Sequence, residues 1–350
     1  MKQLIECVPN FSEGRDLSVI KQITGVIEGV QGIKLLNVDP GFATNRTVVT
    51  FVGEPDAVVE AAYLAIKKAS ELIDMRRHKG EHPRFGATDV CPLIPISNIT
   101  MEETVELARK LARRVGNELN IPVYCYEFAA YTERRRSLSH SRSGEYEGLT
   151  DKMKMAEWQP DFGPVDYNIQ SGATAIGARN FLIAYNVNLD TSSVEIAKSI
   201  AADVREAGKI IRAKDQITVK IIQDKIGEPE RIPGTLKKVR AIGWRIKEYG
   251  IVQVSMNLTD INVTPMHRAF EEVCEKALQN GTSVTGSELI GLVPLKAMLD
   301  AGIHFLKKKH LSIHISEREI IQSAIESLRL DELTPFDPEN RIIEYLLDES

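Results

Sequence analysis

The chain has few cysteines, and none of them lies close to another in the sequence. Its four cysteines, Cys7, Cys91, Cys125 and Cys274, are scattered over 350 residues with no CxxC spacing. Disulfide frameworks and cysteine-based zinc sites both use short, repeated cysteine spacings. The pattern therefore predicts reduced, packed thiols in a cytoplasmic protein.

The sequence also lacks long apolar runs and an excess of positive charge. Glu6 interrupts the amino terminus before any apolar stretch could serve as a signal peptide, and no later run is long enough to span a bilayer. The formal net charge of -5 argues against a broad basic face for nucleic acid or membranes. No Walker or dinucleotide fingerprint is present, since residues 172–177 (GATAIG) precede a predicted strand rather than a helix. We expect a soluble protein with no nucleic-acid and no membrane partner.

Hydrophobic periodicity predicts two α/β modules, and 43% hydrophobic residues in 350 can supply two ordinary cores. The first half has expected strands at 4–8, 34–38, 47–52, 91–96 and 123–128, and expected helices at 17–27, 56–73 and 102–119. The second half has expected strands at 181–187, 238–246, 252–258 and 283–289, and expected helices at 193–207 and 266–278. The order βαββαβ is that of ferredoxin-like domains. We therefore predict an α/β (α+β) fold with two ferredoxin-like subdomains facing each other across a ligand cleft.

The expected boundaries follow from this plan. An amino-terminal subdomain covers 1–180, a second subdomain covers 181–330, and a short helical tail covers 331–350. A helix is expected at 316–330, and Asp337 before Pro338 suits the start of another. The irregular segment 132–172 contains Trp158 and Phe162, which are costly to leave in water, so we expect it to be ordered.

Residues 76–84 (RRHKGEHPR) are the most informative stretch, because seven of the nine are ionisable and Gly80 and Pro83 oppose a regular helix. His78 and His82 lie among four cations, which favours their neutral forms. A proton carrier of near-neutral pKa beside an anion-binding surface fits this composition. His82 is expected to be held the more tightly of the two, because Pro83 restricts its backbone.

Two alternatives to catalysis apply to these histidines. Their i, i+4 spacing is that of a zinc-binding helix, but no further ligand of matching spacing stands nearby, so we expect no metal. They could also be ordinary polar surface residues. Asp39 has a similar alternative, since residues 39–41 (DPG) are common turn residues as well as a place for a functional acid.

Five motifs together resemble one known family. They are residues 6–15 (ECVPNFSEGR), 39–41 (DPG) with 44–47 (TNRT), 77–84 (RHKGEHPR), 144–149 (GEYEGL) and 291–295 (GLVPL). In this order and spread they resemble glutamate formimidoyltransferase. The resemblance implies a homodimer of two-subdomain protomers with tetrahydrofolate bound in the cleft. It also implies transfer of the formimino group from N-formimino-L-glutamate to N5 of tetrahydrofolate, giving 5-formimidoyltetrahydrofolate and L-glutamate in histidine degradation.

The resemblance also implies roles for individual residues. His82 matches the catalytic histidine, and Asp39 matches an assisting carboxylate. Arg46, Arg77, Lys79 and Arg84 are expected to bind the carboxylates of formiminoglutamate and of the folate tail. The segment that matches the family's folate-binding region comprises Gly163, Pro164, Val165, Asp166, Tyr167, Asn168, Ile169, Gln170, Ser171 and Gly172.

Several functional alternatives stay open. Animal relatives carry a fused cyclodeaminase, and residues 335–346 resemble the junction to it, so a separate cyclodeaminase subunit or none is expected here. Formyl transfer from N-formylglutamate would use the same site. A non-catalytic folate-binding relative would bind without turnover. An RNA-binding protein is disfavoured, because residues 252–258 (VQVSMNL) contain no aromatic side chain for base stacking.

Overall fold

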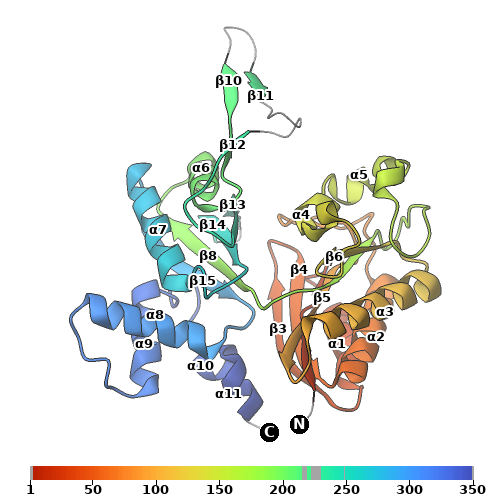
Figure 1. Cartoon of the computed structure of the whole chain (residues 1–350), viewed down its shortest axis with the longest axis horizontal. Helices are drawn as coiled ribbons and strands as arrows, with labels where there is room; N and C mark the ends of the chain where they lie inside the picture. The colour runs from red at the N-terminus through yellow and green to blue at the C-terminus, as the bar shows by residue number, and fades with distance from the viewer. Residues whose placement is uncertain (1–2, 215–218, 222–229, 248, 349–350) are drawn as a thin grey trace. The chain divides into compact units, whose positions relative to one another are not determined.

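A computed structural model of the chain describes residues 3–214, 219–221, 230–247 and 249–348. The chain divides into two compact units, Met1–Asn180 and Phe181–Ser350, coloured red to yellow-green and green to blue in Figure 1. Each unit has its own cluster of buried hydrophobic residues. Within the described part of the chain, no helix is both long enough and apolar enough to cross a membrane.

The first unit is a mixed sheet with helices. Its strands are β1 (Leu4–Cys7), β2 (Asn10–Phe11), β3 (Ile33–Gly41), β4 (Arg46–Gly53), β5 (Thr88–Ser97), β6 (Val123–Glu127) and β7 (Thr174–Ala178). Its helices are α1 (Leu17–Glu28), α2 (Pro55–Leu72), α3 (Met101–Leu119), α4 (Leu138–Ser141) and α5 (Glu145–Lys152), with 3-10 turns at Glu133–Arg136 and Ala156–Trp158. Across the sheet, β3 pairs with β4, β1 and β2 both lie between β4 and β5, and β7 lies between β5 and β6. Among the strands just named, only the pairings of β7 are parallel.

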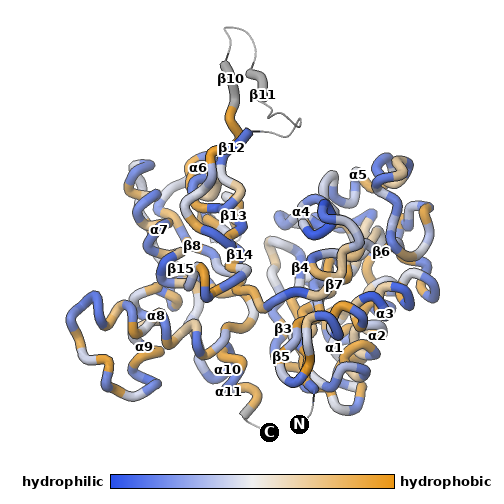
Figure 2. Tube along the Cα trace, viewed as in Figure 1, coloured by the Kyte–Doolittle hydropathy of each residue, from blue (hydrophilic) through white to orange (hydrophobic). Residues whose placement is uncertain are grey.

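Three long helices, α1 to α3, pack side by side against this sheet (Figure 1). α3 begins at a capping box between Thr100 and Glu103 and ends at Asn120, whose φ of 53° is left-handed. Hydrophobic and hydrophilic positions alternate along the three helices (Figure 2), and Leu111 and Val115 of α3 are fully buried. Alternate strand residues therefore point to the helices, and those between them point to the other face of the sheet.

The second unit contains a four-stranded antiparallel sheet in the order β13, β14, β8, β15. Its strands are β8 (Ile183–Leu189), β9 (Lys209–Ile210), β10 (Arg212–Lys214), β11 (Val219–Ile221), β12 (Arg231–Ile232), β13 (Val239–Ile246), β14 (Ile251–Leu258) and β15 (Val284–Ile290). Its helices are α6 (Val194–Val204), α7 (Met266–Gln279), α8 (Leu295–Lys308), α9 (Glu317–Leu328), α10 (Pro338–Arg341) and α11 (Ile343–Asp348). The sheet strands and the helices α6 and α7 follow the predicted order βαββαβ.

Strand β7 was not expected from the sequence, which assigned no element to residues 172–177 and placed the next strand at 181–187. The segment is itself a strand, parallel to both β5 and β6. All five of its residues are buried, so it lacks the polar alternation that marks a half-exposed strand. Gly177 is required there because a Cβ would lie 2.6 Å from the ring of Tyr126.

The irregular segment 132–172 folds around short helices, as expected of an ordered region. The Trp158 ring stacks on His140 with ring centroids 4.3 Å apart. Residues of the predicted tail lie in the second unit, where Asp337 caps α10 and the buried Ile342 forms a β-bridge with Val293.

Candidate active site

Residues 76–84 form an irregular loop in the first unit, which is the structure their composition predicts. The loop is attached to the turn between β3 and β4. Asn45 of that turn donates from Nδ2 to the carbonyl oxygen of Lys79 at 3.0 Å. Gly80 packs on the same turn, since a Cβ there would lie 2.1 Å from the carbonyl oxygen of Thr44. The glycine is therefore needed for the close approach of two backbones.

His78 is a buried structural residue. Its Nε2 lies 2.7 Å from the carbonyl oxygen of Asn45, and its Nδ1 accepts from Nε of Arg84 at 3.2 Å. Nε2 is thus the protonated nitrogen of a neutral ring. Burial, and then the charge of Arg84, lowers its pKa. His78 is only 6% exposed and uses both ring nitrogens inside the protein, so it is firmly held. The expectation that His82 is held more tightly stays a prediction.

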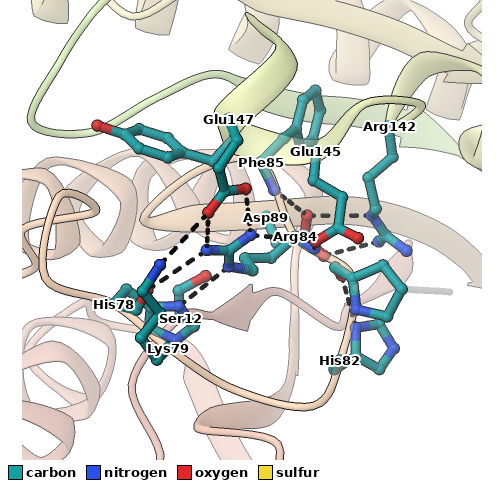
Figure 3. Close-up of polar contacts among 12 residues, drawn as sticks. Ser12, His78, Lys79, His82, Arg84, Phe85, Asp89, Arg142, Glu145 and Glu147 are labelled. Atoms are coloured by element: carbon teal, nitrogen blue, oxygen red, sulfur yellow. Dashed lines mark hydrogen bonds and ion pairs between the residues drawn. The ribbon is translucent and has the colours of Figure 1, made fainter.

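Arg84 is held by two carboxylates of α5 (Figure 3). It forms two hydrogen bonds with Glu147, each 2.8 Å long, and a third of 3.0 Å with Glu145. These bonds from Arg84 lower the pKa of Glu147 to about 2. An anion that bound Arg84 would have to compete with both carboxylates, so its role as a substrate ligand stays a prediction.

The other two basic residues of the expected substrate set are exposed. The side chains of Arg77 and Lys79 are 88% and 80% accessible. Their nearest acidic partners are distant for hydrogen bonds, at 3.8 Å to Asp74 and 3.9 Å to Glu147. The Arg77 guanidinium and the Lys79 ammonium can therefore leave these weak ion pairs and bind an anion with little loss of free energy.

His82 is half-buried beside Arg46. Nη1 of Arg46 contacts both ring nitrogens and lies 3.1 Å from Nε2. Nδ1 also lies 2.6 Å from the carbonyl oxygen of Pro83; a proton on Nδ1 would be donated there and would leave Nε2 to accept from Arg46. Burial, then the charges of Arg46 and Arg142, holds the pKa of His82 well below its usual range. The sequence predicted a His82 that is driven toward its neutral form but keeps a near-neutral pKa. The direction of the pKa shift agrees with this prediction, but burial lowers the pKa further than the neighbouring charges alone would.

The buried carboxylate Asp89 organises this part of the site. Its side chain is inaccessible, and its Oδ2 lies 3.0 Å from Nη1 of Arg46. The same oxygen lies 2.6 Å from Nη2 of Arg142 (Figure 3). Oδ1 accepts from Nε of Arg142 at 3.2 Å and from the Phe85 backbone at 3.2 Å. Burial lowers the pKa of Arg46 only to about 10, so Arg46 is still a cation near neutral pH.

A strand irregularity places Asp89 there. Asn10 of β2 pairs with Val90 of β5, but the next residue, Phe11, pairs with Thr88, which leaves Asp89 as the extra residue of a bulge. Bulges redirect side chains and are frequent beside active sites. Asp89, Arg142 and Asn10 were not identified from the sequence. Asn10 and residues 144–149 lie in family-like motifs, but no sequence signal marks the bulge.

Asp39 lies on the same face of the sheet as Arg46. It pairs with Val48 of β4, which pairs with Asn10 of β2. The Oδ1 of Asn10 in turn accepts from Nε and Nη2 of Arg46 at 2.9 and 2.7 Å. Because cross-strand partners share a face, the register brings Asp39, Asn10 and Arg46 to one region.

Residues 163–172 pack beside the basic loop and α5. The backbone carbonyl of Gln170 accepts from the backbone N–H of Met75 at 2.9 Å, and the Tyr146 hydroxyl donates to the Ile169 carbonyl at 2.6 Å. Both terminal glycines have packing reasons. A Cβ on Gly163 would lie 2.4 Å from the carbonyl oxygen of Ile121, and one on Gly172 would lie 2.2 Å from that of Phe85. Within the segment, Val165 and Ile169 are exposed, at 53% and 56%.

No group of three or more histidine, cysteine, aspartate or glutamate side chains in the described part of the chain is arranged to hold a metal ion.

Comparison with known proteins finds two family regions. Residues 4–179 match the family described as "Formiminotransferase domain, N-terminal subdomain", and residues 184–348 match "Formiminotransferase domain". The chain is 44% identical over 306 residues to "Glutamate formimidoyltransferase" of Thermoplasma acidophilum, covering 87% of this chain and 92% of that protein. It is 38% identical over 314 residues to the protein of that name from Streptococcus pyogenes, covering 90% and 97%.

A longer relative matches over the whole of this chain. "Formimidoyltransferase-cyclodeaminase" of Mus musculus is 49% identical over 350 residues. The match covers 100% of this chain but only 61% of the mouse protein.

Proposed function

Because this chain belongs to the formiminotransferase family, we propose that it transfers the formimino group of N-formimino-L-glutamate to N5 of tetrahydrofolate, releasing L-glutamate. The observation that carries the proposal is the extent of the match. Two relatives named glutamate formimidoyltransferase are covered for 92% and 97% of their length.

The geometry around His82 supports a role in moving a proton. The formimino group is an amidine that already carries a proton near neutral pH, so its carbon is electrophilic, and Asp39 stabilises the cation. N5 attacks this carbon and a tetrahedral intermediate forms. A proton then leaves N5 and reaches the glutamate nitrogen, after which the bond from carbon to that nitrogen breaks. The neutral ring of His82 has one unprotonated nitrogen, which accepts the first proton and donates it to the leaving group.

The lowered pKa of His82 fits the second half of this cycle. A group of low pKa is neutral before reaction and holds an accepted proton weakly. It therefore returns the proton to the departing nitrogen readily. Arg46, which contacts the ring, is a cation near neutral pH and also offers a charge for a substrate carboxylate.

Folate binding is proposed for residues 163–172. The exposed aliphatic side chains of Val165 and Ile169 suit an aromatic ligand. The exposed cations Arg77 and Lys79 lie on the neighbouring loop and suit the glutamyl carboxylates of either substrate, including a polyglutamate tail.

Purified protein is expected to form 5-formimidoyltetrahydrofolate from tetrahydrofolate and N-formimino-L-glutamate, followed by absorbance and mass spectrometry. N-formylglutamate is the control donor, because it differs from the first donor by one heteroatom. Turnover with the formyl donor alone would change the reaction but keep the site. Tight folate binding without turnover of either donor would make the protein a non-catalytic relative.

We also propose a cytoplasmic homodimer, which the family resemblance implies. Light scattering of the purified protein is expected to give twice 39.0 kDa, and a mass near 39.0 kDa would contradict the dimer. A cyclodeaminase that acts on the product belongs to the same proposal, since the mouse relative carries that activity in its name. Its recovery with the tagged protein from the native cell tests the association.

A further inference from the structure

The face of the first sheet opposite α1 to α3 carries a stripe of polar side chains. Val49 and Phe51 of β4 point into the core cluster, so Val48, Thr50 and Val52 point the other way. The strand register fixes which residues join them. Asp39 and Asn10 share the row of Val48, Asn37 shares the row of Thr50, and Lys34 and Glu6 share the row of Val52. The stripe thus runs from the region of Arg46 and His82 to Glu6.

Two oxygen acceptors on this stripe are buried without a partner among the described residues: Oδ1 of Asn37 and Oε2 of Glu6. Glu6 is only 1% exposed. Its neighbours on the same row, Val52 of β4 and Ile94 of β5, are apolar and offer no donor. Buried acceptors without a hydrogen bond reduce stability. The stability of the fold therefore does not explain why polar side chains occupy positions 6 and 37.

The chemistry of these atoms restricts the ligand that would use them. Both accept hydrogen bonds, so the ligand must supply N–H or O–H donors. The glutamyl ends of both substrates carry acceptor-only carboxylates, which Glu6 would repel. The formimino group is a donor, but it has to be at His82 for reaction. The pyrimidinone edge of the pteridine ring carries an amide N–H and an amino group, and it meets both conditions.

The spacing also fits a pteridine. The rows of Asp39 and Glu6 are separated by four residues of β4, which is about 13 Å at the usual rise per residue. A fused two-ring system lying along the strands, with hydrogen bonds at both ends, spans a length of that order. N5 would then lie toward Asp39, and the pyrimidinone edge would lie toward Glu6.

We propose that Glu6 and Asn37 bind the pyrimidinone edge of the pteridine of tetrahydrofolate, with Oε2 and Oδ1 accepting its N–H donors. The proposal rests on the proposed function, because it assumes that tetrahydrofolate is a substrate. It assigns a role to Glu6 of residues 6–15, a family-like motif that the reaction chemistry does not otherwise use.

The ionisation of Glu6 gives the proposal a signature. Burial raises its pKa to about 7, opposed by Arg179. Other titratable groups near it are the Cys7 thiol, whose pKa is raised by burial, its neighbour Cys91, and Lys34 on the same row. N–H donors from a ligand favour the ionised carboxylate. Binding of tetrahydrofolate therefore releases a proton from Glu6, and its Kd falls as pH rises through about 7.

The test compares Glu6→Gln and Asn37→Leu with the wild type by titration with tetrahydrofolate under anaerobic conditions. Each variant is expected to raise its Kd about tenfold to a hundredfold, the size of a lost hydrogen bond to a polar or charged group. The Kd of p-aminobenzoylglutamate, which lacks the pteridine, and the KM of N-formimino-L-glutamate are expected to be unchanged. The melting temperature without ligand is expected to be equal or higher, because Asn37→Leu removes an unpaired acceptor and Glu6→Gln removes a buried ionisable group.

Glu275→Gln, an exposed exchange in α7, is the matched control and is expected to change none of these values. The Kd of the wild-type protein for tetrahydrofolate, measured between pH 6 and 8, is a second test, and it does not depend on whether a variant folds. A Kd within twofold of wild type in both variants, an equal loss for p-aminobenzoylglutamate, or a flat pH profile would overturn the proposal while wild-type turnover persists. Wild-type protein that neither binds nor converts tetrahydrofolate would instead overturn the proposed function, and this inference with it.

Discussion

Replacement of His82 by asparagine is expected to lower kcat about a hundredfold to ten-thousandfold, the usual contribution of a positioned acid or base. Asparagine keeps polar atoms near Arg46 and the Pro83 carbonyl, but it has no nitrogen that accepts and returns a proton. The Kd of tetrahydrofolate is expected to change little, because the ring does not hold the cofactor-like substrate. Steady-state turnover and equilibrium titration measure the two quantities.

The matched control is His314→Asn, an exposed histidine of the second unit, which should leave both quantities unchanged. The pH profile provides a further check. Because the pKa of His82 is well below 6.5, the base is neutral at pH 7, and kcat should fall only at more acidic pH, as the ring becomes protonated. Near wild-type turnover in the asparagine variant would remove His82 from the proton transfer, whatever else the site does.

The two histidines of the loop show where sequence reasoning stops. Both stand among the same cations within five residues, and composition gave each of them the same neutral form. The structure separates them by their partners: His78 is enclosed by Asn45 and Arg84, while His82 lies between Arg46 and the Pro83 carbonyl. Those partners come from β4, the turn before it and the far end of the loop, so local sequence could not distinguish the two roles.

Most regular elements could be predicted because their periodicity is strong. α3 has charged and apolar residues at helical spacing and a capping box at Thr100, and it was expected within one residue of its observed bounds. β7 was missed because a strand buried on both faces has no alternation. The same limit applies to the site. The basic loop is visible as composition, but Asp89 depends on a bulge and Arg142 on the position of the next segment.

The partner of Arg84 is a related case. Residues 77–84 and 144–149 were both recognised as family-like motifs, and neither showed that they form one contact. Arg84 joins them through Glu145 and Glu147, so the acidic motif holds the basic loop in place. Two separate sequence signals therefore describe one structural unit. An arginine in a binding loop can stabilise the loop or bind a substrate. The acidic residues around it in the folded protein determine which of the two it does.

Asp89→Asn is expected to have the largest effect on stability, lowering it by about 3–5 kcal/mol, the usual effect of removing one partner of a buried ion pair. Arg46 and Arg142 are only 11% and 12% exposed, and both guanidinium groups approach the same carboxylate. Without its charge they face each other with no anion between them. Asparagine still accepts from the Phe85 backbone, so the loss reflects charge rather than shape. Thermal and urea unfolding measure the change.

Asp151→Asn is the matched control, because Asp151 and its ion-pair partner Lys154 are both exposed, so its removal should leave the unfolding midpoint nearly unchanged. The double variant Asp89→Asn with Arg142→Met tests the cause. If the loss comes from an uncompensated cation, removing Arg142 as well should cost less than the sum of the two single variants. Additive losses would mean that Asp89 acts through packing of the bulge instead.

The same variants are expected to lower kcat, since Asp89 fixes Arg46 and Arg46 contacts the ring of His82.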